Sequence, residues 1–432
     1  MNTSTKINLS AMMFLEFFIW GAWFVTMGTY LGSMGFTGGQ IGNAYITTAI
    51  AAIISPIFVG MIADKFFSAQ KLLGVLHLLG AVLMYFVSTI ESPGLFFWVL
   101  LAYALCYMPT LALANAIAFN QMSDSEKEFP LIRAIGTCGW IVVGLFLGIT
   151  RIEDTNIPML IAAGASLLLG LYAFFLPHTP PKGAGKKVTI GDILGIEALR
   201  LMKDGYFTVF VIASLLVAMT TSFYFGFANL YFNESGMEYT AAIMTGGQFS
   251  EAIFIALLAF FFAKMGIKTI LTVGMLAWSV RYFLMAFGGS DTIVMLSMWY
   301  IAIIIHGLCF GFFFIAGQVY VEKVAPKVIQ ASAQGFIALV TFGIGHALGA
   351  RFSGMVVDVY TTGAGEEMTR NWTAIWLVPA VIALVVGVLF ALFFKVKPTE
   401  IPVEAPDEVS EDIPEAAPAE ADAETPEEPV AE

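Results

Sequence analysis

The chain has 432 residues, of which 59% are hydrophobic and only 12% are charged. Soluble globular proteins usually contain about 45–50% apolar and about 25% charged residues. The composition therefore excludes an ordinary soluble enzyme, a disordered scaffold and a secreted domain built on disulfides. The net charge of −12 arises at one end, because residues 398–432 contain thirteen Asp or Glu and no Lys or Arg. We expect this segment to be a disordered, solvated cytoplasmic tail.

The rest of the chain contains twelve apolar runs long enough to cross a membrane, which takes about 20 residues. The predicted helices cover 9–31, 40–63, 72–90, 95–121, 131–150, 158–176, 206–232, 240–263, 269–288, 292–319, 330–357 and 372–394. Lys and Arg gather in cytoplasmic loops of membrane proteins. With the N-terminus inside, fifteen basic residues lie in cytoplasmic segments and two in outer loops. Both termini are therefore predicted to be cytoplasmic.

The longest internal connection, 177–205, divides the helices into two groups of six. It begins PHTPPKGAGKK and is rich in basic residues. We therefore expect an N-terminal half over 1–176, a cytoplasmic linker over 177–205 and a C-terminal half over 206–397, followed by the tail 398–432. This all-α arrangement resembles the major facilitator superfamily, in which the substrate site lies between two halves near the middle of the membrane.

A short loop after the second predicted helix reads GMIADKFFSAQK at 60–71. It resembles the G-x-x-x-D-[RK] loop of the same superfamily, with Gly60, Asp64 and Lys65 at the matching positions. Glycine lets two helices approach closely, and an aspartate can bind helix-end amides or a neighbouring cation. We expect these three residues to form a conformational latch.

Ionisable residues inside membrane helices are costly and usually functional. Glu251 lies near the middle of the run 240–263, and Gln248 precedes it on the same helical face. A carboxyl group at this depth is suited to binding and releasing a proton, and the amide to binding a polar substrate. The alternative is a structural hydrogen bond between helices, with Arg133 or Arg281 as partner.

Arg133, Thr137 and Trp140 form a stripe on the run 131–150. A cation, a hydroxyl and an indole in this order suit an anion, a carboxylate or a planar ligand. The alternative is that Arg133 lies near the cytoplasmic end of its helix and extends its charged group to the interface there.

Glu16 shares a helical face with two tryptophans in the first run. It is either a second proton-carrying carboxyl group or the counter-charge of a buried arginine, and both alternatives stay open. We expect the other buried ionisable groups Arg281, His346 and Arg351 to be mainly structural.

Aromatic and polar residues on two further runs complete the candidate site. His306 and Phe310 share a face in the run 292–319, and Thr221 and Tyr224 share one in the run 206–232. Aromatic rings can stack on a nucleobase or a sugar, and histidine can donate, accept or titrate. The alternative for each of them is a packing residue of the helix bundle.

No pattern indicates a cofactor, a metal site or an enzyme. The three cysteines, Cys106, Cys138 and Cys309, lie in apolar runs without metal-binding spacing. The sequence contains no Walker A loop, H-E-x-x-H or G-x-S-x-G motif.

Several segments together resemble the bacterial nucleoside:proton symporter family of the major facilitator superfamily. They are EFFIWGAWF (16–24), GMIADKFFSAQK (60–71), YMPTLALANAIAF (107–119), FPLIRAIGT (129–137), QFSE (248–251) and YVEKVAPKVIQASAQG (320–335). The resemblance covers about residues 8–397 and implies a twelve-helix transporter of the inner membrane that imports nucleosides with protons by alternating access. It also implies that Arg133, Thr137, Gln248 and Glu251 are site residues.

The sequence departs from the family pattern at three places. Gly311 stands where the helix 10 pattern of the family has an aspartate, and Glu16 stands where a glutamine is expected. The polar pair of helix 7 has only Thr221, Ser222 and Tyr224 as candidates. These departures leave open the path of the coupling proton and the identity of the substrate.

Two other functions remain open at this stage. One is a facilitator or symporter of another small polar solute, such as a sugar. The other is a solute-binding membrane receptor with the acidic tail as its output. In each case we expect a monomer in the lipid bilayer whose partners are a small solute and protons, and not nucleic acid.

Overall fold

The computed structural model describes residues 1–58, 67–180, 196–363 and 365–396. These residues are almost entirely helical, since a peptide group in hydrocarbon must find its hydrogen bond within the protein. Among them the strands are β1 (Thr361–Thr362) and β2 (Thr369–Arg370), a short antiparallel pair. Gly60, Asp64 and Lys65, most of the predicted linker and the acidic tail lie outside the described residues.

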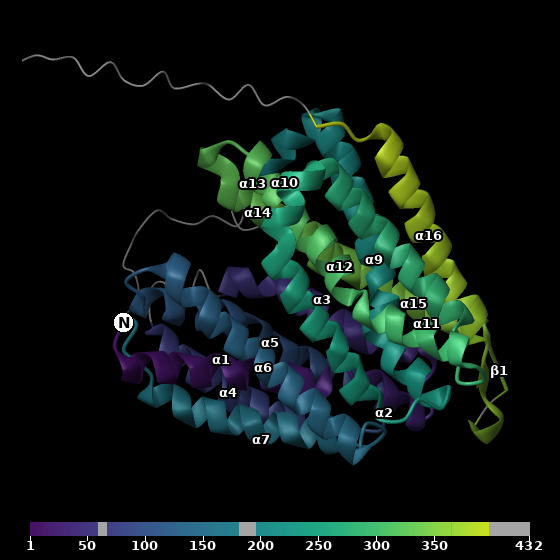
Figure 1. Cartoon of the computed structure of the whole chain (residues 1–432). Helices are drawn as coiled ribbons and strands as arrows, with labels where there is room; N and C mark the ends of the chain where they lie inside the picture. The colour runs from purple at the N-terminus through teal and green to yellow at the C-terminus, as the bar shows by residue number, and fades with distance from the viewer. Residues whose placement is uncertain (59–66, 181–195, 364, 397–432) are drawn as a thin grey trace, which may run out of the picture. The chain divides into compact units, whose positions relative to one another are not determined.

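The helices form two sets, drawn in purple to blue and in teal to yellow in Figure 1. The N-terminal set contains α1 (Thr3–Trp23), α2 (Met27–Ser33), α3 (Gly38–Phe58), α4 (Ala69–Val87), α5 (Pro93–Gln121), α6 (Ser125–Thr150), α7 (Ile157–Tyr172) and η2 (Ala173–Phe175). The C-terminal set contains η3 (Ile196–Lys203), α9 (Gly205–Glu234), α10 (Thr240–Phe287), α11 (Ile293–Ile304), α12 (His306–Phe310), η4 (Gly311–Ile315), α13 (Ala316–Val324), η5 (Lys327–Ile329), α14 (Gln330–Ala338), η6 (Leu339–Gly345), α15 (His346–Val359), η7 (Gly365–Glu367) and α16 (Trp372–Phe393).

Ten helical segments of the described chain are long and apolar enough to cross a membrane. One of them, α10, spans two of the predicted helices, 240–263 and 269–288. Its helical backbone is interrupted between them at Gly266, which has a φ of 69°. Helix α3 corresponds to the predicted run 40–63, and its described part ends at Phe58. The all-helical, multi-spanning fold expected from the sequence is therefore confirmed.

Two predicted helices contain a π-helical stretch where a regular α-helix was expected. Residues Gly311–Ile315 interrupt the run 292–319, and Leu339–Gly345 interrupt the run 330–357. A π-helical turn is wider than an α-helical turn, because its hydrogen bonds join residues five apart. Such stretches occur frequently at functional sites. Apolar periodicity does not distinguish them, because the hydrophobic pattern continues through both.

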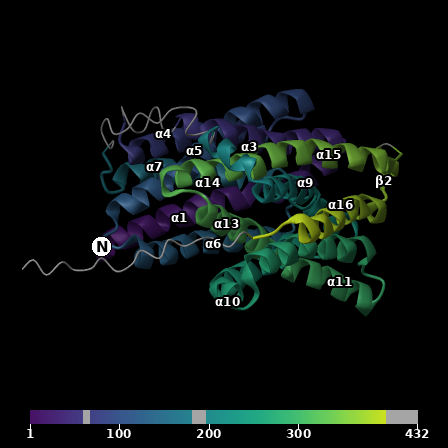
Figure 2. The ribbon, with the colours of Figure 1, turned by 90° about the horizontal axis from the view of Figure 1, so that it is seen from above.

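The two sets pack closely where α3 lies beside α15, as Figure 2 shows. In lipid there is little hydrophobic driving force for helices to associate, so they associate through close packing, which small residues allow. A Cβ atom on Gly42 would lie 2.3 Å from the carbonyl oxygen of Ala350. Glycine is therefore required at this crossing of the two sets.

Candidate functional site

A pocket lies between the two helix sets, lined by residues of α1, α6, α9 and α10. Three predicted site residues line it, Trp140 from α6, Tyr224 from α9 and Gln248 from α10. The other lining residues are Gly21, Val25, Thr26, Gly144, Leu147, Phe225, Asn229, Ala241, Met244 and Thr245. The lining is mostly apolar with a few hydroxyl and amide groups, which suits a small ligand that is both flat and polar.

One wall of the cavity is built around Trp140. Its ring meets that of Trp20 edge to face at 5.6 Å between centroids. Gly21 on α1 makes room for the indole, because a Cβ atom there would lie 3.0 Å from two ring carbons of Trp140. The indole is thus held from one side by the Trp20 ring while it lines the cavity.

Glu251 lies one helical turn beyond Gln248 on α10, and its side chain is 26% exposed. The nearest ionisable partner is His306, whose Nε2 is 3.5 Å from Oε2 of Glu251. The helices can meet here because Gly307 has no side chain. A Cβ atom at Gly307 would lie 2.3 Å from the carbonyl oxygen of Ser250.

His306 connects Glu251 to a fully buried arginine. Nη1 of Arg281 lies 2.7 Å from Nδ1 of His306, and Cζ of Arg281 lies 3.4 Å from the centre of the Tyr224 ring. The rings of Tyr224, His306 and Phe310 follow one another at 5.6 and 6.0 Å between centroids. The structure therefore brings together four residues singled out in the sequence and adds Arg281, which was expected to be mainly structural.

The alternative considered for Glu251, a structural bond to an arginine, is not what the structure shows. The ion-pair partner among the described residues is His306. Arg133 instead places its guanidinium carbon 3.9 Å from the centre of the Phe17 ring, within the N-terminal set. Arg133 is close enough to act electrostatically on Glu251 without touching it.

Two further predicted residues are not among those that line the cavity. Thr137 is partly buried on α6. Thr221 is fully buried, with its hydroxyl 3.0 Å from Nε2 of His346 and 2.8 Å from the carbonyl oxygen of Ala218. Thr221 therefore does not line the cavity, although it lies on the same helical face as Tyr224.

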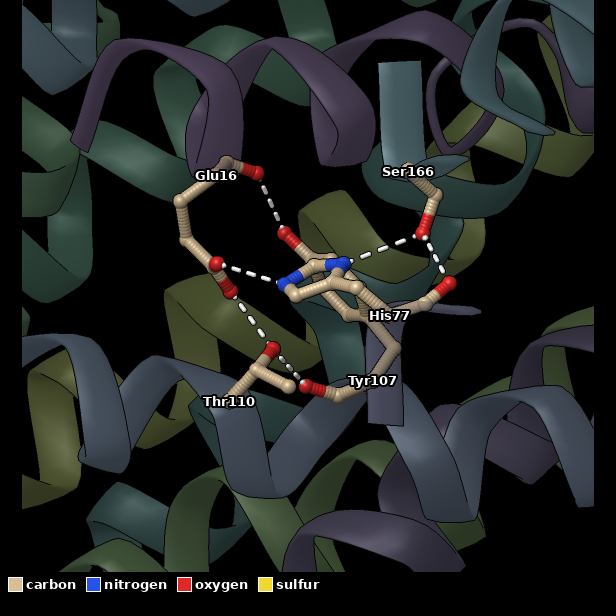
Figure 3. Close-up of polar contacts among 5 residues, drawn as sticks. All are labelled: Glu16, His77, Tyr107, Thr110 and Ser166. Atoms are coloured by element: carbon tan, nitrogen blue, oxygen red, sulfur yellow. Dashed lines mark hydrogen bonds and ion pairs between the residues drawn. The ribbon is translucent and has the colours of Figure 1, made fainter. Parts of the chain in front are cut away.

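Glu16 lies inside the N-terminal set, fully buried among polar groups from three other helices (Figure 3). Its Oε2 is 2.9 Å from Nε2 of His77, and its Oε1 is 2.6 Å from the hydroxyl of Thr110. The Tyr107 hydroxyl donates to the carbonyl oxygen of Glu16, and Nδ1 of His77 is 3.0 Å from the hydroxyl oxygen of Ser166. The alternative that Glu16 neutralises a buried arginine was wrong, because its partner is a histidine.

The hydrogen bonds limit where the protons of this pair can be. The Ser166 hydroxyl donates to the carbonyl oxygen of His77, so its oxygen accepts a hydrogen from Nδ1. One proton remains between Nε2 of His77 and the carboxylate of Glu16. On either atom it leaves the pair with no net charge, as burial in an apolar interior favours.

A second buried carboxylate, Glu153, holds the two sets together at one end. It belongs to the turn between α6 and α7 and is 4% exposed. It accepts hydrogen bonds from Nδ2 of Asn229, Nδ2 of Asn233 and the backbone N–H of Ala241, at 2.7, 3.0 and 2.9 Å. All three donors come from the C-terminal set.

Two more contacts between the sets lie at the same end. Thr29 after the break in the first helix donates to Oδ1 of Asn229, and the backbone N–H of Gly39 donates to Asp358 at the end of α15. Glu153, Asn229 and His77 were missed in the sequence. His77 had a usable signal, because a histidine inside a predicted membrane helix is itself unusual. Glu153 had none, since it lies in a predicted loop.

Known proteins resemble this chain along most of its length. The family described as nucleoside H⁺ symporter matches residues 1–399. The protein YegT of Escherichia coli (strain K12) is 46% identical over 389 residues, which cover 88% of this chain and 91% of YegT. The xanthosine permease of the same organism is 33% identical over 400 residues, covering 88% of this chain and 94% of the permease.

A solved structure shows the same fold. The crystal structure of the nucleoside transporter NupG has a TM-score of 0.84 and 32% sequence identity, and the match covers 92% of this chain and all of the NupG chain. NupG is a transporter of the major facilitator superfamily. The all-helical, multi-spanning fold and the family resemblance expected from the sequence are confirmed, and the chain is a transporter and not an enzyme. This multi-pass membrane protein belongs to the nucleoside:H⁺ symporter family, and its function is nucleoside transport coupled to protons.

Proposed function

We propose that nucleosides bind in the cavity between the two helix sets and that Glu251 is the principal proton site. The observation that carries this proposal is the partial exposure of Glu251 one turn from the cavity-lining Gln248. Glu16, by contrast, is fully buried and hydrogen-bonded on both carboxylate oxygens. A proton taken from water reaches Glu251 directly, whereas Glu16 can only assist by exchanging its proton with His77.

The cavity supplies groups that match the parts of a nucleoside. The ring of Trp140 offers a flat surface for a base, and Gln248 offers both a donor and an acceptor. Tyr224 also lines the cavity, with one face of its ring covered by Arg281. We assign His306 and Phe310 to the ring column beside Glu251, and Arg133, Thr137 and Thr221 to supporting roles around the cavity. These three do not line it, so their effect on affinity should be weaker.

The proposal also includes several features that were predicted from the sequence. We infer twelve membrane spans in two halves, 1–176 and 206–397, with the linker 177–205 between them. Both termini lie in the cytoplasm and the protein is a monomer of the inner membrane. Gly60, Asp64 and Lys65 act as the latch, and 398–432 is an acidic cytoplasmic tail. With this orientation the Glu153 contacts lie on the outer side, so the structure is the state closed to the outside.

The proposal is tested by changing Glu251→Gln in proteoliposomes. The amide keeps the size of the side chain but cannot carry a proton, so uridine accumulation driven by an inward proton gradient should be lost. Exchange of labelled for unlabelled uridine needs no net proton movement and should continue. Glu238→Gln, which changes an exposed carboxylate, is the control and should accumulate uridine as the wild type does.

Two results would contradict this assignment. Accumulation by Glu251→Gln with an unchanged response to the gradient would exclude Glu251 as the proton site. Inhibition of uptake by a hexose but not by adenosine would show that the cavity binds another polar solute.

A further inference from the structure

We propose that Arg281 and His306 form a relay that positions the carboxylate of Glu251 and holds it in its charged form between transport cycles. In this arrangement His306 contacts the buried, positively charged Arg281 through one ring nitrogen and faces Glu251 with the other. His306 does not itself carry the transported proton. The inference rests on Glu251 being the proton site. It assigns Arg281 as a positioning residue, which neither the sequence pattern nor the family description does.

Arg281 is the first observation behind the relay. Its side chain is fully buried, and no carboxylate of the described residues lies within ion-pair distance of it. Nε and Nη2 have no hydrogen-bond partner among the described residues, and the guanidinium lies against the face of Tyr224. Burying an uncompensated charge costs several kcal/mol. Among the described residues, the contact of Nη1 with His306 is the one that leads on to a carboxylate, that of Glu251.

The hydrogen count fixes the state of His306. An arginine side chain only donates and does not lose its proton in proteins. Nδ1 of His306, 2.7 Å from Nη1 of Arg281, must therefore accept. The imidazole hydrogen is then on Nε2, which faces Glu251. While Arg281 occupies Nδ1, the ring cannot take a second proton there, so it acts as a fixed donor.

The distance of 3.5 Å between Nε2 and Oε2 is longer than an ordinary hydrogen bond. Glu251 is partly exposed, so its side chain has room for the small rotation that brings its charged carboxylate onto the fixed donor. A carboxyl group that has gained a proton loses most of this attraction. The relay therefore distinguishes the two states of Glu251, as a coupling site requires.

Other titratable groups surround the relay from several helices. Arg133 on α6 acts on Glu251 through space, and Tyr224 on α9, Cys309 on α12 and Tyr282 on α10 lie within electrostatic range of Arg281. None of them is hydrogen-bonded to Glu251 among the described residues. Arg281 thus acts on Glu251 by a contact route that the other groups do not share.

The pH dependence of uridine uptake tests the relay with three variants. Arg281→Gln removes the charge. His306→Asn keeps an acceptor near Nδ1 but is too short to reach Glu251. His306→Gln places an oxygen toward Arg281 and an N–H toward Glu251 and cannot titrate. Size-exclusion profiles show which variants fold, and His346→Gln, which changes another histidine of the C-terminal set, is the matched control.

We expect the pH of half-maximal uptake to rise by about one unit in Arg281→Gln and in His306→Asn, because a nearby positive charge favours the ionised carboxylate. His306→Gln and His346→Gln should keep the wild-type midpoint. A midpoint unchanged in His306→Asn would overturn the relay even if Arg281→Gln fails to fold. Loss of gradient-driven accumulation in His306→Gln would show instead that the imidazole carries the proton.

These outcomes separate the relay from the proton site itself. If Glu251→Gln still couples uptake to protons, the proposed function fails first. If Glu251→Gln is uncoupled and His306→Asn keeps the wild-type midpoint, only the relay fails.

Discussion

Glu16 and His77 show how a membrane protein can bury two ionisable groups without burying a net charge. The single proton between them leaves the pair neutral, and Thr110, Tyr107 and Ser166 satisfy the remaining polar atoms (Figure 3). Removing one partner leaves the other unsatisfied, whereas removing both leaves no ionisable group there. The hydroxyls of Tyr107, Thr110 and Ser166 would still donate to backbone carbonyl oxygens.

The stability of this pair can be measured in detergent. Glu16→Leu should lower the free energy of unfolding by about 3–5 kcal/mol, since His77 loses its charged partner. The double change Glu16→Leu with His77→Leu should recover most of that loss. A double variant as unstable as the single one would show that the pair contributes more than mutual neutralisation.

At the scale of the element, the contact between α10 and α12 depends on glycine. Gly307 places α12 against the backbone of Ser250, where a Cβ atom has no room. Gly246 on α10 is different, because the nearest atom to its Cβ position is a side-chain carbon of Ile303 at 3.8 Å. The same substitution by alanine can therefore be compared at Gly307, where a Cβ atom has no room, and at Gly246, where it has room.

Gly307→Ala should therefore reduce uridine uptake strongly, by about tenfold or more, because the helices separate and His306 moves away from Glu251. Gly246→Ala should transport as the wild type does. Initial rates in membrane vesicles, corrected for the amount of protein, give the comparison. Equal rates in the two variants would mean that the backbone adjusts without disturbing the site.

At the scale of the whole molecule, Glu153 is the main polar connection between the two helix sets. Its three hydrogen bonds all cross from one set to the other. A transporter that alternates between two states must break these contacts to open that end. The nearby pair Arg151–Glu238 also crosses, but both side chains are exposed, and exposed ion pairs contribute little.

Glu153→Ala should shift the equilibrium toward the state open at that end. A cysteine introduced at Thr245, which lines the cavity, reports the change in a background without the native cysteines. Its modification by a maleimide that cannot cross the membrane should become about tenfold faster, which corresponds to about 1.4 kcal/mol. Glu238→Gln should leave the rate nearly unchanged. An unchanged rate in Glu153→Ala would mean that the contacts do not control opening.

Part of the candidate site was accessible from single residues. Glu251, Gln248, Trp140 and Tyr224 were found because a polar group or a dense aromatic cluster inside an apolar helix is unusual. The same reasoning placed Thr221 beside Tyr224, yet its hydroxyl is used by His346. Helical periodicity gives the face of a helix but not which neighbour covers that face.

The amino-acid sequence alone determined the class of protein, its helices and its family, because the membrane requires long apolar runs and internal hydrogen bonds. These are local properties that composition and spacing record. Only the tertiary structure decided the partners: His77 for Glu16, His306 for Glu251 and Arg281, and Asn229 for Glu153. Each partnership joins residues far apart in the sequence at a distance of a few ångströms, and such distances depend on how closely the helices approach one another.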